Sequence, residues 1–311
     1  MTTQDEQDKL ARSVLLGTLF LFLGGLFVAF AGIGLRYAVQ DGLGAQTTGL
    51  WRFLLSLPLL AVVFMFMRRL PRKPNLFAIL TGIFFGMDIG FWHMSLTMTS
   101  VANATFIVNL GSISVGFLAW IFLKERPSVF WGVAVVMAVI GAWMLSRGGQ
   151  MDAGSGGLRG DLLACVAAGF ISFYFLNARI ARRSLPAIDV IFWMTLSMTV
   201  VATGFCLVFG EPLVPDSLPD LKWPFLIALI AHVLGQGLII LGIGRAPANV
   251  AGIMVIVQPV ASAIASWPLF GEALAGLQLA GAGLILAALL TSQFSALRLR
   301  AAGRRPTKLS Q

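Results

Sequence analysis

The chain has 311 residues, of which 58% are hydrophobic and only 11% are charged, and its formal net charge is +9. Soluble domains carry about 25% charged residues, so this composition argues against a soluble protein and indicates a helical membrane protein with many spans. The positive residues lie in short segments between apolar runs, as the positive-inside rule describes, and a nucleic-acid-binding role fits them less well.

Ten apolar runs of about twenty residues follow one another, and each is long enough to cross a bilayer as a helix. We predict spans at residues 13–37, 46–67, 75–97, 101–123, 128–146, 158–179, 187–209, 223–244, 248–270 and 274–297. The polar residues before the first run lack a small-residue cleavage site, so we expect that run to be retained. Cys165 and Cys206 lie within apolar runs and are expected to pack as small side chains, without a disulfide or a metal site.

Two stretches of the chain, residues 100–126 and 247–273, resemble each other. Aligned without a gap, the identities include Ala104 with Ala251, Val108 with Val255, Trp120 with Trp267 and Glu125 with Glu272. Internal repeats of membrane-length helices are typical of transporters. We therefore predict a cytoplasmic N-terminal segment (1–12), a first five-helix repeat (13–147), a Gly-rich linker (148–157), a second five-helix repeat (158–297) and a basic cytoplasmic tail (298–311).

The basic residues are unevenly distributed between the two sides of the predicted membrane. With the N-terminus inside, seventeen of the 22 Lys and Arg residues lie on the cytoplasmic side. Four, namely Arg36, Arg147, Arg159 and Lys222, lie on the opposite side, and Arg52 lies within a span. The positive-inside rule then predicts that both termini are cytoplasmic. Because each half has an odd number of spans, the second half enters from the other side, which makes an inverted repeat.

Several stretches carry a resemblance to a known family. They are T-G-L-W-R-F-L-L-S-L-P-L-L (48–60), S-V-A-N-A (100–104), F-L-K-E-R-P (122–127), R-G-D-L-L-A (159–164) and Q-P-V-A-S-A-I-A-S-W-P-L-F-G-E (258–272). They are similar to drug/metabolite transporters of the EamA type, and among these to the YddG-like aromatic amino-acid exporters. The resemblance implies two inverted five-helix repeats around a central cavity, alternating access, and a multi-pass protein of the bacterial inner membrane.

Asp88 and Arg52 are the two charged residues placed deep in predicted spans. A lone charge at that depth is unfavourable by at least about 2.5–3.5 kcal/mol, so each side chain should face the protein interior or water. Three interpretations remain open. The two residues can form a structural pair, they can line a substrate cavity, or Asp88 can couple transport to protons.

Isolated polar and aromatic residues within the apolar runs are the candidates for lining a substrate cavity. They are Asp88, Trp92, His93, Asn109, Ser112, Tyr174, Asn177, His232, Gln236 and Gln258. The competing interpretation for the amides and hydroxyls is hydrogen bonding between helices, and for the two histidines it is a satisfied interior position. With two histidines and no H-E-x-x-H motif, we expect neither a metal site nor a cofactor.

Two features suggest helix packing and movement. Gly82, Gly86 and Gly90 recur at a spacing of four, which predicts a helix face without side chains that packs closely and allows motion against a neighbour during gating. Pro259 removes a backbone donor in the middle of span 248–270 and should loosen that helix. Interrupted helices near the midplane often mark the binding site of a transporter.

A mostly apolar chamber with a few amide, hydroxyl and imidazole groups suits a small amphipathic solute and not a polyanion. The leading hypothesis is a monomeric secondary exporter of aromatic and other neutral amino acids and related metabolites. No Walker A motif is present, so the chain itself offers no site for ATP drive. The alternatives are a multidrug or quaternary-ammonium exporter of the same superfamily, a receptor or passive channel, and an intramembrane enzyme. The last requires a paired-aspartate, Ser-Lys or metal constellation that the spans lack, so we expect no enzymatic activity.

Overall fold

The computed structural model describes residues 3–96, 98, 101–124, 127–148, 158–270 and 276–301. The first half contains α1 (Thr3–Gln40), α2 (Ala45–Phe66), α3 (Leu76–Leu96), α4 (Val101–Leu123) and α5 (Val129–Gly148). The second half contains α6 (Leu158–Ala181), α7 (Ala187–Phe209), the 3-10 turn η1 (Leu218–Leu221), α8 (Lys222–Leu226), the π-helix η2 (Ile227–Gln236), α9 (Gly237–Ile243), α10 (Ala248–Met254), α11 (Val257–Phe270) and α12 (Gly276–Ala301). The predicted linker beyond Gly148 and the tail beyond Ala301 lie outside the described residues.

Within the described residues, each of the ten predicted spans overlaps one or more helical segments. Among the described residues, seven helical segments are long and apolar enough to cross a membrane, and three shorter ones are apolar. The three shorter segments are Ile113–Leu123, Val129–Met144 and Gly276–Ala288. No strand occurs in the described ranges. A bilayer offers no hydrogen-bond partners to the backbone, and a helix satisfies its own. The prediction of an all-α membrane protein is confirmed.

Two spans that we predicted as single helices are irregular. Residues 222–243 form α8, η2 and α9 in succession, with π-helical geometry in the middle part. Span 248–270 is divided into α10 and α11, which are separated by Val255 and Ile256. Pro259 lies in the first turn of α11, where a backbone N–H has no partner within the helix. The interruption therefore lies just before this proline, not at it.

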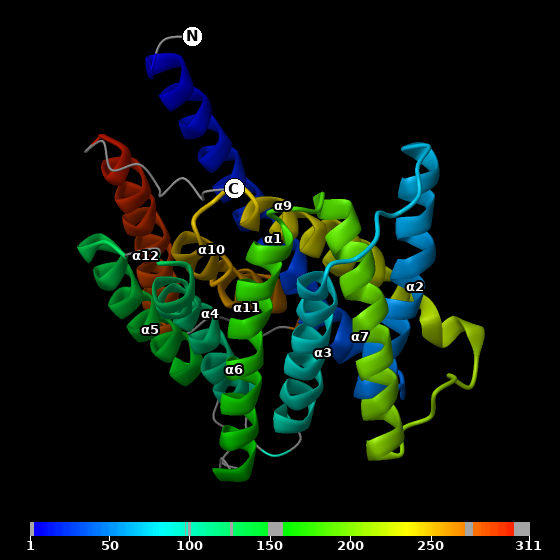
Figure 1. Ribbon diagram of the computed structural model, residues 1–311. Helices are drawn as coiled ribbons and strands as arrows, with labels where there is room; N and C mark the ends of the chain where they lie inside the picture. The colour runs from blue at the N-terminus through cyan, green and yellow to red at the C-terminus, as the bar shows by residue number, and fades with distance from the viewer. Residues whose placement is uncertain are drawn as a thin grey trace.

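The contacts that a helix of one half makes with the other half are repeated by its equivalent helix. α3 packs against α6 and α7, and η2 packs against α1 and α2. Likewise α4 contacts α6, and α11 contacts α1. The pairs α2–α7, α5–α12 and α4–α10 each join equivalent helices of the two halves. Figure 1 shows α1 starting at the top and α6 starting at the bottom, so these two equivalent helices run in opposite directions.

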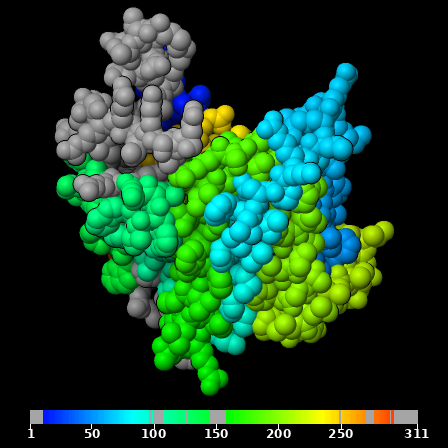
Figure 2. Space-filling view, in the orientation of Figure 1, coloured from blue at the N-terminus to red at the C-terminus, as the bar shows by residue number. Residues whose placement is uncertain are grey.

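α3 lies between α6 and α7, and the three helices are visible side by side on one face (Figure 2). Gly82, Gly86 and Gly90 of α3 face α7, where an added Cβ at any of them would overlap atoms of that helix. At Gly82 the overlap would be with the backbone carbonyl oxygen of Met194. The glycines thus let the two backbones approach closely. Their part in gating movements stays a prediction.

Candidate functional site

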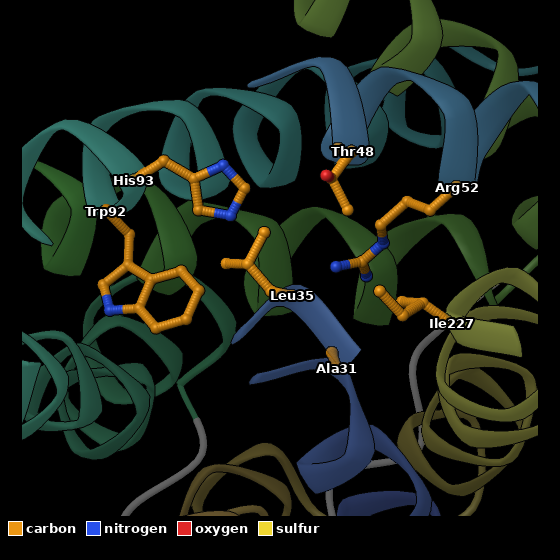
Figure 3. A pocket seen from close by; sticks show the side chains of 8 residues that line it. Ala31, Leu35, Thr48, Arg52, Trp92, His93 and Ile227 are labelled. Carbon is orange, nitrogen blue, oxygen red and sulfur yellow. The ribbon is translucent and has the colours of Figure 1, made fainter. Parts of the chain in front are cut away.

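A small cavity lies where α1, α2, α3 and η2 meet (Figure 3). It is lined by Ala31, Leu35, Thr48, Gly49, Arg52, Trp92, His93 and Ile227. Its free space of about 10 Å³ is room for about one water molecule. Both halves contribute, since Ile227 belongs to the second half and the other lining residues belong to the first. An amino acid does not fit in this cavity in this conformation.

Arg52 and Asp88 are oppositely charged residues on neighbouring helices, and their exposed fractions are only 6% and 4%. The guanidinium of Arg52 points into the cavity and lies over the ring of Phe53, with 4.8 Å from Cζ to the ring centroid. The two charges attract each other through space. Nε of Arg52 and Oδ1 of Asp88 nevertheless lack any hydrogen-bond partner within the described residues. The structural pair considered from the sequence is therefore not formed in this conformation.

Trp92 and His93 line the cavity from α3 (Figure 3), and their ring centroids are 5.4 Å apart. His93 packs against the backbone of Gly49 on α2, where an added Cβ would be 3.4 Å from Cε1 of the imidazole. Nδ1 of His93 is buried and has no hydrogen-bond partner in the described part of the chain. Such unpartnered buried groups are rare in proteins and call for an explanation, for instance a water or a ligand.

His232 lies in the middle of the π-helix η2, and its side chain forms a hydrogen bond with α7. Its Nε2 is 2.8 Å from Oγ1 of Thr195, and this hydroxyl also donates to the carbonyl oxygen of Ile191 at 2.6 Å. Because a hydroxyl has a single proton, Nε2 of His232 must be the donor to Thr195. Nδ1 of His232 has no partner among the described residues, and the ring meets Phe53 edge-on at 5.2 Å. π-Helical turns are frequent at functional sites, which agrees with this position.

Tyr174 and Gln236 are buried polar residues that do not line the cavity. Nε2 of Gln236 donates a hydrogen bond to the hydroxyl of Tyr174. The ring of Tyr174 stacks on Phe85 of α3 with centroids 4.5 Å apart. Asp88 lies three residues after Phe85, and its charge acts on Tyr174. These contacts join α6 and η2 of the second half to α3 of the first.

Of the predicted site residues whose side chains the structure describes, Trp92 and His93 line the cavity, and Asn177, Gln258 and Pro259 do not. Asn177 donates to the carbonyl oxygen of Phe173 within its own helix at 2.8 Å. Gln258 and Pro259 are half-buried on α11, which packs against α1. Asn109 and Ser112 belong to α4, and their side chains lie outside the described part of the structure.

Several lining residues were not predicted from the sequence. Ala31, Leu35, Gly49 and Ile227 are ordinary residues for a membrane helix, so nothing in their local pattern distinguishes cavity from lipid. Thr195 is one of four hydroxyl residues in α7, and its bond to His232 depends on how α7 meets η2 within the second half.

Beyond the cavity, the antiparallel helices α2 and α7 are joined at one end by what we call the α7 clasp, made of Arg69, Arg72, Asp189 and Trp193. Asp189, the third residue of α7, is fully buried and accepts two hydrogen bonds of 2.8 Å from the guanidinium of Arg69. It also accepts the backbone N–H of Arg72 at 2.8 Å. The indole of Trp193 donates to the carbonyl oxygen of Arg72 at 2.7 Å.

The other end is joined by the α2 clasp, made of Thr47, Trp51, Glu211, Pro212 and Leu213. The backbone N–H of Thr47, the third residue of α2, donates to Oε2 of Glu211 at 2.9 Å. The hydroxyl of Thr47 donates to the carbonyl oxygen of Pro212 at 2.7 Å, and the indole of Trp51 donates to that of Leu213 at 2.9 Å. A loop after α7 thus binds the start of α2, as a loop after α2 binds the start of α7.

Comparisons with known proteins agree with this architecture. The chain is similar to the threonine/homoserine exporter RhtA of Escherichia coli strain K12, with 27% identity over 215 residues, which are 68% of this chain and 70% of that protein. It is 26% identical over 199 residues to the uncharacterized transporter YwfM of Bacillus subtilis strain 168, over 62% of this chain and 64% of that one. A protein of known crystal structure, 17% identical, matches with a TM-score of 0.75 over 93% of this chain and 99% of its own.

The family model for the EamA-like transporter family matches the chain twice, over residues 15–147 and 158–292. One match falls on each half, and together they cover most of the chain. The resemblance to EamA-type transporters noted in the sequence is confirmed, whereas the narrower likeness to aromatic amino-acid exporters stays a prediction. The chain belongs to the EamA-like transporter family.

Proposed function

We propose that the protein exports neutral amino acids and related metabolites across the bacterial inner membrane. The observation that carries this proposal is the closed cavity between the two halves. Its lining combines the polar side chains of Arg52 and His93 with the apolar side chains of Leu35 and Ile227. A mainly apolar site with a few polar groups suits a small amphipathic solute. The similarity to a threonine/homoserine exporter supports amino acids as the substrate class.

Transport proceeds by alternating access in this proposal. We assign the structure to a closed intermediate of that cycle, an assignment supported by a cavity with room for about one water molecule and by the two formed clasps. Because the clasps lie at opposite ends of the antiparallel pair α2–α7, release of one would open the cavity toward one face only. Rocking of one repeat against the other around a fixed site is how transporters with inverted repeats work.

The charge distribution supports an orientation with both termini in the cytoplasm. The α7 clasp, which contains Arg69 and Arg72, is then at the cytoplasmic end. The α2 clasp, with Glu211, is at the outer end. We further propose that the protein works as a monomer in the lipid bilayer, without a cofactor.

Counterflow in proteoliposomes tests the proposal. Vesicles containing the purified protein and an excess of unlabelled amino acid should accumulate labelled threonine, homoserine or phenylalanine faster than protein-free vesicles. Acceleration by internal substrate is expected of a carrier and not of a channel. Parallel measurements with and without a pH gradient report whether protons are coupled. If no amino acid in the panel moves or competes, the proposed substrate class is wrong.

The same panel should include a quaternary cation such as tetraphenylphosphonium, because a multidrug exporter is the alternative. Arg52 disfavours that alternative, since a buried positive charge in the cavity lining repels a cation. Transport of the cation without transport of any amino acid would favour the multidrug function.

A further inference from the structure

We infer that Arg52 and Asp88 bind the two charged ends of one zwitterionic substrate, with Arg52 holding the α-carboxylate and Asp88 the α-ammonium group. This inference rests on the proposed function and adds to it the chemical feature that the site recognises. It selects α-amino acids with both ends free over their amides, esters, N-acyl derivatives and decarboxylated amines.

The first support is that both side chains are buried and that each has a buried polar atom without a hydrogen-bond partner among the described residues. Arg52 and Asp88 are more than nine-tenths buried, and Nε of the one and Oδ1 of the other have no hydrogen-bond partner in the described residues. Removing one member of a buried ion pair is unfavourable because it leaves the other charge uncompensated. A buried Arg and Asp that attract each other without contact each retain capacity for a partner of opposite charge.

The second support is their placement. The guanidinium of Arg52 points from α2 into the cavity (Figure 3). Asp88 lies one helical turn before Trp92, which lines the same cavity from α3, so both are on one face of that helix. Arg52 thus lines the closed cavity from α2, and Asp88 adjoins it from α3 one turn away from the lining residue Trp92. The ammonium and carboxylate of an amino acid are attached to the same carbon and would fit between them once the cavity widens.

The third support is charge balance. A zwitterion adds one negative charge beside Arg52 and one positive charge beside Asp88, so the loaded site remains neutral and both protein charges acquire contacts. A substrate that lacks either end leaves one buried charge unpaired. Sites built to bind a polar group strongly reject analogues that lack it, because the groups of the site are then left without partners. The apolar side chains of Ala31, Leu35 and Ile227 then remain to contact the substrate side chain.

The test compares competition by matched analogues of the amino acid that the wild-type protein transports in counterflow. For threonine these are threonine amide, which lacks the carboxylate, and N-acetylthreonine, which lacks the ammonium. We expect each analogue to compete about ten- to a hundredfold more weakly than threonine, as the loss of one charge-assisted contact implies. Equal competition by either analogue in the wild type would overturn the inference without any variant being made.

Variants of Arg52 and Asp88 test which residue binds the carboxylate of the substrate and which binds its ammonium group. Arg52→Gln should abolish the preference for threonine over its amide and keep the preference over N-acetylthreonine, and Asp88→Asn should do the reverse. Arg52→Lys keeps the charge and should retain part of the carboxylate preference. Arg183→Gln and Asp216→Asn are exposed matched controls that should keep both preferences. Variants that weaken all three compounds equally would refute the assignment. Absence of amino-acid transport in the wild type would instead refute the proposed function.

Discussion

Arg69 and Glu211 occupy equivalent places in the two halves. Each lies just after one helix of the α2–α7 pair and binds the third residue of the other helix. Arg69 follows α2 and binds Asp189 of α7, while Glu211 follows α7 and binds Thr47 of α2. The polarity of the contact is reversed between the two. One clasp is a bidentate ion pair on a buried carboxylate, and the other is a carboxylate that accepts a free N–H at a helix N-terminus.

Asp189→Asn should destabilise the protein by about 2 kcal/mol, because an amide offers one acceptor oxygen and turns an N–H group toward the guanidinium of Arg69. The expected value is below that of a fully buried pair, since the side chain of Arg69 is 27% exposed. Thermal unfolding in detergent measures the loss. Asp216→Asn, in an exposed loop, is the matched control. Equal melting temperatures for both variants would show that the ion pair contributes little.

Gly82→Ala should destabilise the packing of α3 on α7. The added methyl group would overlap the carbonyl oxygen of Met194, a backbone atom that cannot turn aside. Overpacking of this kind is unfavourable by about 1–3 kcal/mol. At Gly169 of α6 an added Cβ meets no atom within 4 Å, so Gly169→Ala should keep or raise stability through its better helix propensity. The melting temperatures of the two variants in the same detergent should therefore move in opposite directions, and a parallel change would contradict the close packing.

Asp41 makes one contribution to stability depend on pH. Its carboxylate forms a 2.8 Å ion pair with Nζ of Lys222 and accepts a 2.8 Å hydrogen bond from the indole of Trp223, and these contacts hold the pKa of Asp41 below its ordinary value. A lowered folded-state pKa gives stability that is present above the unfolded pKa of about 4 and is lost as the pH falls through the folded value. Asp41→Asn should therefore lower the melting temperature at pH 7 and change it little at strongly acidic pH.

High salt should reduce the effect of Asp41→Asn at pH 7, because both side chains of the pair are exposed and screened. A difference between wild type and variant that is the same at both pH values would show that the carboxylate charge is not responsible.

The helices and part of the cavity could be predicted because both follow from the unfavourable transfer of polar groups into lipid. Apolar runs of about twenty residues mark spans, and a charge or imidazole inside such a run must face the interior. This reasoning selected Asp88, His93 and His232, which are buried in the structure. It also selected Asn177, whose amide only bonds its own helix, because local sequence does not say which interior position adjoins a cavity.

The clasps could not be predicted because each depends on contacts between distant loops. Arg69 and Asp189 are 120 residues apart, and Thr47 and Glu211 are 164 apart. Charged residues in short loops are expected of any membrane protein, so their presence there carries no information about pairing. The sequence therefore could not distinguish a clasp residue from a charge that only sets the orientation of the chain.

Cys206 offers a native probe of whether the two clasps open separately. It is buried in α7, and both the hydroxyl of Thr47 and the carboxylate of Glu211 act on its thiol. In a Cys165→Ser background, which removes the exposed cysteine, N-ethylmaleimide should modify Cys206 slowly. Glu211→Gln preserves side-chain size but removes the charge that stabilises the start of α2, a loss of about 1 kcal/mol. We expect the modification rate to rise about fivefold, as that energy implies.

Asp189→Asn in the same background is the decisive comparison, since it weakens the clasp at the far end of the same helix pair. If opening one end requires the other to remain closed, this variant shifts the population toward conformations in which the α2 clasp is intact. Modification of Cys206 should then be unchanged or slower than in the parent protein. A rate increase in both variants would mean that either change loosens the whole α2–α7 pair, and the clasps could not act as alternating closures.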